Sequence, residues 1–209
     1  MASITNEDNM LLMARYEDNH FDLAIVDPPY GIKIQQSGGT PKHLGFKDYK
    51  KKKWDNEIPK KEYFDELFRV SKNQIIWGAN YFVEHLNIGT MGWVFWYKGQ
   101  EGLTMSDGEI AYTSFQKATR QININRCYIK TDGAIHPTQK PIKLYEWLLM
   151  NYAKQGDKIL DTHLGSGSIA IACHNLGFDL TACELDKEYF DASVKRLTDH
   201  QMQLRMFNY

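Results

Sequence analysis

The sequence predicts a single α/β domain built on a mostly parallel sheet. Short apolar runs of strand length alternate along the chain with segments of helical periodicity, which is the pattern of successive βα units. Residues 158–197 form the clearest strand–helix–strand–helix unit, with a glycine-rich turn after its first strand. The 209 residues, 43% of them hydrophobic, can bury a core without disulfides or metal but are too few for two full-sized domains.

The N-terminal half contains a strand that stops at a pair of prolines. This first predicted strand, Phe21–Val26, is followed by a polar stretch of about thirty residues, far longer than an ordinary βα connection. Such loops are usually functional or disordered. Pro59 then opens a helix that has aromatic and leucine side chains on one face. Three further strands are predicted at Gln74–Trp77, Gly92–Tyr97 and Glu109–Phe115.

The C-terminal half begins with a polar, basic and weakly patterned stretch, Lys117–Gly133. Pro141 then starts a helix whose large apolar side chains recur at helical spacing as far as Tyr152. The remaining elements are a strand at Lys158–Asp161, a helix at Ser168–Leu176, a strand at Asp179–Glu184 and a helix at Lys187–Leu197.

The composition excludes several classes of protein. No apolar run approaches the roughly 18–20 residues that span a bilayer, and the first ten residues lack the basic and apolar segments of a signal peptide. The three widely spaced cysteines, Cys127, Cys173 and Cys183, indicate neither a disulfide framework nor a zinc site. We therefore expect a cytoplasmic protein with no membrane segment and no bound metal.

Charge is balanced overall, with a formal net charge of -1, but lysines are concentrated in one segment. Residues 42–53 hold six lysines and one aspartate, with aromatic side chains interleaved as far as Trp54. Lysines among aromatic residues suit the neutralisation of phosphates and stacking on bases. A solvated loop is the alternative interpretation.

A glycine-rich turn joins the strand that ends at Asp161 to the helix that begins at Ser168. Gly165 and Gly167 let the backbone pass close to a ligand and turn sharply. Glu184 ends the next strand, where a carboxylate can accept hydrogen bonds from ribose hydroxyls. Together they predict a nucleoside-containing ligand. The turn fits NAD, through a GxGxxG/A match, as well as S-adenosylmethionine, and does not decide between them.

The tetrapeptide Asp27-Pro28-Pro29-Tyr30 decides between the two ligands. Its prolines fix φ and remove two backbone donors, which makes a stiff platform after the first strand. The Asp27 carboxylate and the Pro28 carbonyl could accept the two N–H bonds of an exocyclic amino group and free its lone pair for attack. Tyr30 would stack on a base extruded from the duplex. The predicted reaction is an in-line displacement at a sulfonium methyl group, in which positioning carries most of the rate enhancement.

These motifs, with His136-Pro137-Thr138-Gln139-Lys140-Pro141 between them, resemble the β class of DNA adenine-N6/cytosine-N4 methyltransferases. In that family a DPPY segment comes first, a segment like HPTQKP follows, and a helix then leads into a DxxxGSG turn. All three occur here in that order and cover most of the chain. The resemblance implies the class I S-adenosylmethionine-dependent methyltransferase (Rossmann-like) fold with permuted motif order, a seven-stranded, mostly parallel sheet and one antiparallel strand.

The resemblance also assigns roles to site residues. The catalytic residues would be Asp27, Pro28, Pro29 and Tyr30. The residues that bind S-adenosylmethionine would be His136, Pro137, Thr138 and Lys140 at the methionine end, where Lys140 would pair with the carboxylate, and Asp161, His163, Gly165, Ser166, Gly167, Ser168 and Glu184. By its residues alone, HPTQKP is a helix start capped by Thr138.

One segment of this chain departs from the family's pattern, and another resembles it. The family's turn usually has Pro-Phe where this chain has Thr162-His163. The contacts of this turn with the cofactor are therefore expected to differ from those of the family. Residues 77–82 (WGANYF) resemble a wall of the target-base pocket, with a packed aromatic corner as the alternative.

The expected substrate is double-stranded DNA with a flipped target base. We expect one methyltransferase domain over residues 1–209, with insertions at 31–56 and 117–133 as target-recognition segments. DPPY in this family leans towards adenine N6 and SPPY towards cytosine N4, which favours adenine. So little recognition surface predicts a short site, low specificity or a homodimer. In the second segment, phosphates or guanine edges could be reached by Lys117, Arg120, Arg126 and Lys130, and adenine by Gln121, Asn123 and Asn125.

Other functions stay open at this point. An S-adenosylmethionine-dependent RNA methyltransferase would keep every motif. Protein-glutamine methyltransferases favour Asn-Pro-Pro-Tyr after the cofactor turn, which is the opposite order. A binding module without turnover is disfavoured by Asp27 and Tyr30, and an NAD dehydrogenase would leave the DPPY segment without a role.

Overall fold

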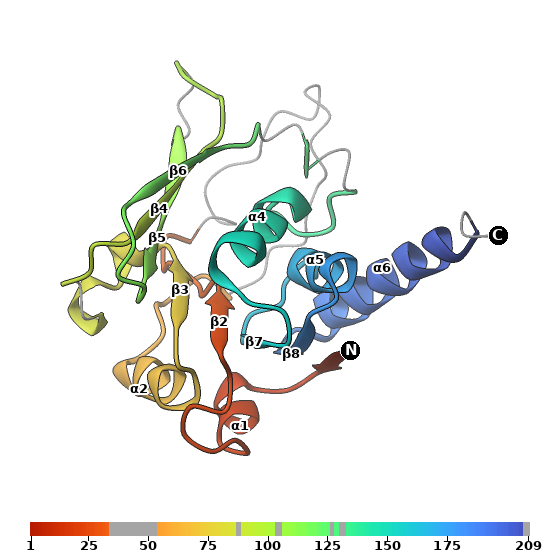
Figure 1. Cartoon of the computed structure of the whole chain (residues 1–209), viewed down its shortest axis with the longest axis horizontal. Helices are drawn as coiled ribbons and strands as arrows, with labels where there is room; N and C mark the ends of the chain where they lie inside the picture. Colours follow the sequence, from red (N-terminus) through yellow and green to blue (C-terminus); the bar gives the residue numbers. More distant parts are fainter. Residues whose placement is uncertain (34–53, 87–88, 103–105, 126–127, 130–132, 207–209) are drawn as a thin grey trace.

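The computed structural model describes residues 1–33, 54–86, 89–102, 106–125, 128–129 and 133–206 (Figure 1). The strands are β1 (Ala2–Thr5), β2 (Leu23–Val26), β3 (Gln74–Trp77), β4 (Trp93–Tyr97), β5 (Gly108–Thr113), β6 (Arg120–Asn123), β7 (Lys158–Asp161) and β8 (Asp179–Cys183). The helices are α1 (Asn9–Met13), α2 (Lys61–Val70), α4 (Ile142–Tyr152), α5 (Ser168–Leu176) and α6 (Lys187–Met206), with short 3-10 turns at Ala79–Tyr81 and Val83–His85.

The strands form one sheet in the order β1-β8-β7-β2-β3-β5-β4-β6. β5 pairs antiparallel with both β3 and β4, whereas the other strand pairs of the described residues are parallel. Because β5 runs against its neighbours, its first residues lie at the edge of the sheet where the parallel strands end.

Side chains of β2 alternate between two apolar layers. Leu23 and Ile25 join a layer with α4 and α5, which lie side by side (Figure 1). Ala24 and Val26 join a second layer with α1 and α2. All four side chains are fully buried, as expected for a parallel strand that is covered by helices on both faces.

The chain leaves β2 and β7 in opposite directions along the sheet. From β7 it passes through α5 to β8, and from β2 it passes through α2 to β3 on the other side. Since α5 and α2 belong to opposite apolar layers, a crevice is expected where the two paths diverge, outside the carboxyl ends of β2 and β7.

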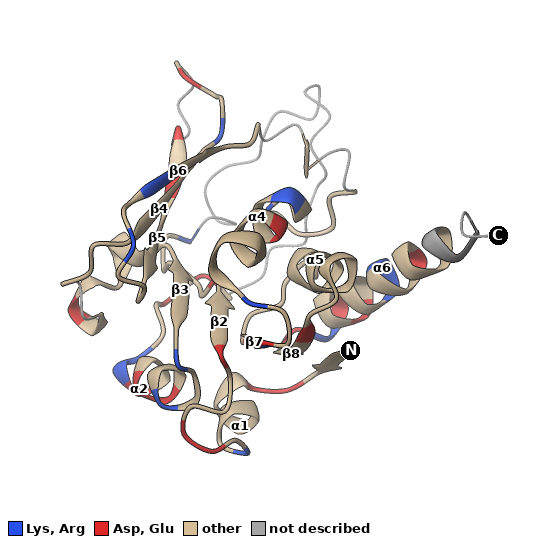
Figure 2. Ribbon diagram, viewed as in Figure 1, with Lys and Arg blue, Asp and Glu red and all other residues tan. Residues whose placement is uncertain are grey.

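Figure 2 shows acidic and basic residues interspersed along α2 and α6. Several are i,i+4 ion pairs with mostly exposed side chains, such as Lys61–Asp65 at 2.6 Å and Lys195–Asp199 at 2.5 Å. Exposed pairs of this kind contribute little stability. Within the described ranges, no helix combines the length and the apolar character that crossing a bilayer requires.

The predicted α/β architecture is confirmed, and the sheet has eight strands rather than the expected seven. The two strands that the residue pattern missed, β1 and β6, are the edge strands. Most side chains of β1 and β6 are exposed or half-buried, so neither strand carries the apolar run of a covered strand. β6 lies within residues 117–133, the weakly patterned stretch in which no strand was expected. α6 also continues past its expected end at Leu197 to Met206.

Candidate active site

The carboxyl ends of β2, β7 and β8 open into one cavity of about 530 Å³. Its wall comes from segments that are far apart in the sequence, namely residues 7–9, the tip of β2 at Asp27 and Pro29, residues 136–140, the turn after β7 and residues 184–187. This is the crevice that the strand order predicts.

The turn after β7 is shaped by a left-handed glycine and held by α6. Gly167, the N-cap of α5, has a φ of +71°, and a Cβ there would lie 3.0 Å from that of Ser193. Arg196 donates hydrogen bonds to the carbonyl of Ser166 at 2.9 Å and to the hydroxyl of Ser168 at 3.0 Å. A charged donor on α6 therefore holds the backbone of the turn in place.

Glu184, just past β8, is held by the backbone. Its Oε2 accepts from the amide of Gly165 at 2.8 Å, and its Oε1 accepts from the amide of Asp186 at 2.8 Å. The amide of Gly167 in turn donates to the carbonyl of Leu164 at 2.9 Å. These amides of the turn are thus already used within the protein, and they hold the Glu184 carboxylate in a fixed orientation at the cavity wall.

Asp161 and His163 are both uncharged near neutral pH. Burial raises the pKa of Asp161 to about 8, against the hydrogen bond from the His163 amide at 2.9 Å, and the nearby charge of Asp27 adds to the rise. Burial lowers the pKa of His163 to about 3. The ring nitrogens of His163 lie 3.0 Å from Thr162 Oγ1 and 3.1 Å from Asn9 Nδ2. The histidine that departs from the family pattern is therefore built into a hydrogen-bonded wall.

The DPPY segment is fixed by a carboxylate that the sequence did not reveal. Asp55, which is buried, accepts from the amides of Tyr30 at 2.9 Å and Gly31 at 3.0 Å through one oxygen. The Tyr30 hydroxyl donates to Asp27 Oδ1 at 2.7 Å. Burial raises the pKa of Tyr30 well above its ordinary value, so the hydroxyl stays protonated as a donor.

Aromatic side chains surround the ring of Tyr30. Tyr81 stacks on it with ring centroids 5.1 Å apart and planes 16° apart, and Phe82 meets it edge-on. The approach requires Gly78, whose φ is +69° and whose Cβ, if present, would lie 2.1 Å from Tyr30 Cε1. Trp77 and Phe82 are fully buried, whereas Tyr81 is 41% exposed. Residues 77–82 thus form both a packed corner and a partly open aromatic surface.

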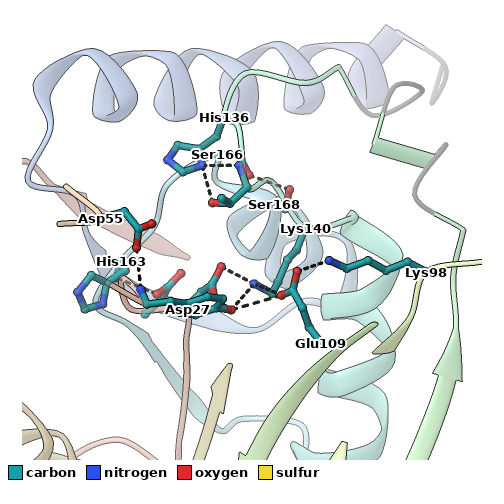
Figure 3. Close-up of polar contacts among 12 residues, drawn as sticks. Asp27, Asp55, Lys98, Glu109, His136, Lys140, His163, Ser166 and Ser168 are labelled. Carbon is teal, nitrogen blue, oxygen red and sulfur yellow. Dashed lines mark hydrogen bonds and ion pairs between the residues drawn. The ribbon is translucent and has the colours of Figure 1, made fainter. Parts of the chain in front are cut away.

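Lys140 lies at the centre of a buried ionic cluster (Figure 3). Its side chain is 2% exposed, and Nζ lies 2.5 Å from Asp27 Oδ2 and 3.0 Å from Glu109 Oε2. Glu109, at the start of β5, also pairs with Lys98 at 2.5 Å. Nζ is 3.3 Å from the Tyr30 hydroxyl. We define Asp27, Tyr30, Lys98, Glu109 and Lys140 as the lysine–carboxylate cluster.

The charges of this cluster support one another. Although burial disfavours a charged Glu109, Lys140 and Lys98 lower its pKa to about 2. Burial likewise disfavours a charged Lys140, but Asp27 and Glu109 raise its pKa. Burial raises the pKa of Asp27 against the attraction of Lys140. Two carboxylates and two lysines balance in charge.

The HPTQKP segment precedes α4 but does not cap it through Thr138. The helix begins at Ile142 with Pro141 at the N-cap and no side-chain cap. The Thr138 amide instead points back to His136 Nδ1 at 3.3 Å. The His136 ring packs edge-on against Tyr189 at 4.3 Å between centroids, which ties the segment to α6.

The structure brings most of the predicted site residues together. The cavity is lined by Asp27, Pro29, His136, Thr138, Lys140, His163, Gly165, Ser166 and Glu184. The other six do not line the wall but lie within two residues of these in the chain, namely Pro28, Tyr30, Pro137, Asp161, Gly167 and Ser168. The ammonium of Lys140 is held by the carboxylates of Asp27 and Glu109, and its expected pairing with a methionine carboxylate stays a prediction. Among the described residues, no cluster of His, Cys, Asp and Glu could hold a metal.

Sequence reasoning missed Glu7, Asp8 and Asn9, which line the cavity, and Asp55, Glu109 and Lys98. No motif marks these residues. The lysine-rich part of residues 31–56 lies outside the described residues, as do Arg126 and Lys130. Of the second recognition segment, Lys117 donates to the carbonyl of Asn151 at 2.9 Å, and Arg120 is exposed on β6.

Comparison with known protein families gives a match to the middle and C-terminal part of the chain. The family model of the N6/N4 DNA methylases matches residues 92–195. The type II methyltransferase M.HpaI of Haemophilus parainfluenzae is 27% identical, over 87% of this chain and 69% of that protein. The type II methyltransferase M2.DpnII of Streptococcus pneumoniae is 40% identical over a shorter stretch, 30% of this chain and 23% of that protein.

Solved structures share the fold. The M1.HpyAVI–SAM complex superposes with a TM-score of 0.63 at 20% identity, covering 94% of this chain and 100% of that chain. The PvuII cytosine-N4-specific DNA methyltransferase superposes with a TM-score of 0.60 at 15% identity, covering 97% and 92%.

Proposed function

Since the chain belongs to the N6/N4 DNA methylase family and has the class I methyltransferase fold, we propose that it methylates the N6 amino group of adenine in double-stranded DNA. The methyl donor in this proposal is S-adenosylmethionine. The observation that carries the proposal is that Asp27 of the DPPY segment and the glycine-rich turn with Glu184 line the same cavity.

The charge of the cavity favours a cationic donor. S-adenosylmethionine carries a sulfonium and an ammonium group, whereas NAD carries an anionic pyrophosphate. A pyrophosphate would need free amide donors at the start of α5, but the amides of Gly165 and Gly167 are already bonded within the protein. The lining has more carboxylates than lysines, namely Glu7, Asp8, Asp27, Glu184 and Asp186 against Lys140 and Lys187.

Residues that line or adjoin the cavity would bind the donor and orient the target base. Glu184 would accept hydrogen bonds from ribose hydroxyls, as its fixed carboxylate allows. Tyr30 would stack on the flipped base. Asp27 and the Pro28 carbonyl would accept the two amino hydrogens and orient the nitrogen lone pair towards the methyl group. When bound, the donor supplies the electrophilic methyl. The methylated nitrogen then loses a proton, for which Asp27 is the nearest buried acceptor.

The preference for adenine rests on Asp27. The fold does not discriminate, because one structural relative is a cytosine-N4-specific enzyme. Relatives that act on cytosine lean towards serine at this position, so aspartate supports adenine. We further propose that residues 1–209 act as one methyltransferase domain, that residues 31–56 and 117–133 contact the DNA around the flipped base, and that two copies share a recognition site. The type II relatives support a role in restriction–modification.

Expression in a host that lacks N6-methyladenine and N4-methylcytosine tests the proposal. Nucleoside mass spectrometry of the host DNA should show new N6-methyladenine, and modification-sensitive long-read sequencing should give its sequence context. Asp27→Ala should abolish the signal, while Asp65→Ala, on the exposed face of α2, should keep it. New N4-methylcytosine would correct the base, and methylation confined to RNA would correct the substrate. A lack of both DNA marks at normal protein levels would refute the proposal.

A further inference from the structure

The ammonium group of Lys140 occupies the position where a substrate amino group would be received. It lies 2.5 Å from Asp27 Oδ2, the carboxylate proposed to accept the target N–H bonds. The same ammonium lies 5.3 Å from the ring centroid of Trp77 and 5.7 Å from that of Tyr30. A nitrogen donor that lies near two aromatic rings and is bonded to Asp27 makes one of the two hydrogen bonds that the exocyclic amino group of a stacked base would make.

A target amino group must therefore displace Lys140 from Asp27. The Lys140 side chain is only 2% exposed, so water does not replace the lost partner. A buried charge that loses its counter-ion is strongly destabilised. Without a second partner for Lys140, this cost would oppose every productive entry of a base.

Glu109 supplies that second partner. Its Oε2 lies 3.0 Å from Lys140 Nζ, while its Oε1 is held by Lys98 at 2.5 Å. The two oxygens thus face different lysines, and Lys98 anchors the carboxylate (Figure 3). Glu109 reaches this place because β5 is antiparallel and starts at the edge where β2 ends.

Building on the proposed function, we propose that Lys140 is a placeholder for the target amino group and that Glu109 is a positioning residue that retains Lys140 when the amino group takes over Asp27. The cluster keeps its charge balance in both arrangements. The Asp27 carboxylate is thereby kept ionised and oriented before the base arrives, and no buried charge is left alone when it does.

Glu109→Gln tests this mechanism, with tritiated S-adenosylmethionine as donor and plasmid DNA free of adenine-N6 and cytosine-N4 methylation as acceptor. Lys140 would then have Asp27 as its sole carboxylate in the cluster, so kcat/KM should fall by about a hundredfold. The double variant Glu109→Gln/Lys140→Met removes the competing cation and should regain at least about tenfold over the single variant. Glu17→Gln, exposed in the loop before β2, is the matched control and should match the wild type.

The pH dependence of kcat/KM distinguishes the proposed role of Glu109 from a purely structural one, which would leave the profile unchanged. The charge of Glu109 raises the pKa of Asp27, so Glu109→Gln should shift the acid limb of kcat/KM to lower pH. Binding of labelled S-adenosylmethionine, measured by equilibrium dialysis, should stay within about threefold of the wild type and shows that the variant is folded.

Several results would overturn the inference. One is a Glu109→Gln variant with wild-type kcat/KM, and another is a double variant no more active than the single one. Should Glu109→Gln fail to bind the donor, the double variant alone decides, because the inference requires it to be folded and active. A wild-type chain without transfer to DNA refutes the proposed function, whereas an active wild type with an unaffected Glu109→Gln refutes this inference alone.

Discussion

Replacing Gly78 by alanine should displace the ring of Tyr30 from the site. A Cβ at Gly78 would lie 2.1 Å from Cε1 and 2.5 Å from Cδ1 of Tyr30, where ordinary carbon contacts are about 3.5–4.0 Å. The ring must therefore move by about 1.5 Å. Such a movement would break its hydrogen bond to Asp27 at 2.7 Å and disturb its stack on Tyr81.

The cost has two separable parts. An alanine at the φ of +69° found at Gly78 costs about 1–2 kcal/mol through backbone strain. Loss of a hydrogen bond to a carboxylate adds about 1.5–3 kcal/mol. The sum predicts that Gly78→Ala lowers the free energy of unfolding by about 2.5–5 kcal/mol. Gly102→Ala isolates the first part, because Gly102 has a φ of +75° and nothing within 4 Å of its Cβ position.

Urea denaturation of four variants measures both parts. Gly78→Ala should cost clearly more than Gly102→Ala, and the excess should disappear when Gly78→Ala is introduced into a Tyr30→Ala background. Methyl transfer by Gly78→Ala should fall together with that excess. Equal costs for the two glycine substitutions, or an excess that persists without the Tyr30 ring, would refute the reasoning.

Three further predictions follow from the site. Because burial raises the pKa of Asp161 from 3.8 to about 8, the folded state keeps a proton that the unfolded state loses above about pH 4. This stabilisation is fully present below about pH 4 and is lost progressively as the pH rises to 8. The stability of the wild type relative to Asp161→Asn should thus fall by about 1 kcal/mol per pH unit between pH 5 and 8, and a pH-independent difference in urea titrations would contradict it. Arg196→Met removes charge-assisted bonds to the turn and should cost about 1.5–3 kcal/mol, with weaker binding of S-adenosylmethionine by calorimetry; unchanged binding would show that α6 does not shape the turn. Asp55→Ala leaves the amides of Tyr30 and Gly31 without this acceptor, at about 1–3 kcal/mol each, and should lower kcat more than the affinity for S-adenosylmethionine, so a loss confined to donor affinity would argue against a role in holding the DPPY segment.

Elements with strong local signals could be predicted from the sequence. β2 is a continuous apolar run that is buried on both faces, β7 has the buried pair Ile159 and Leu160 at its centre, and the turn before α5 is marked by its glycines. β1 and β6 could not be predicted in this way, because their pairing is decided by distant strands rather than by their own side chains. β1 joins the sheet through β8, which lies almost a whole chain length away.

The same limit applies to the site. Asp27, Gly165 and Glu184 stand at the ends of predicted strands or in a glycine-rich turn, so their meeting at one edge could be expected. Glu109 stands at the beginning of a strand, whereas site residues of a parallel sheet are expected just after the strands end. Asp55 lies in a loop without a motif. Its role depends on hydrogen bonds from two backbone amides, and backbone donors leave no pattern in the sequence.

The antiparallel pairing of β4 with β5 has a consequence for how securely the site is specified. Glu109 is opposite Trp96 in this pairing. A slip of the register by one residue would turn Glu109 to the other face of the sheet and leave Lys140 facing Asp27 alone. The alignment of a hairpin that contains none of the three sequence motifs therefore governs the electrostatic surroundings of Asp27. Insertions or deletions between these two strands should alter catalysis without touching a motif residue.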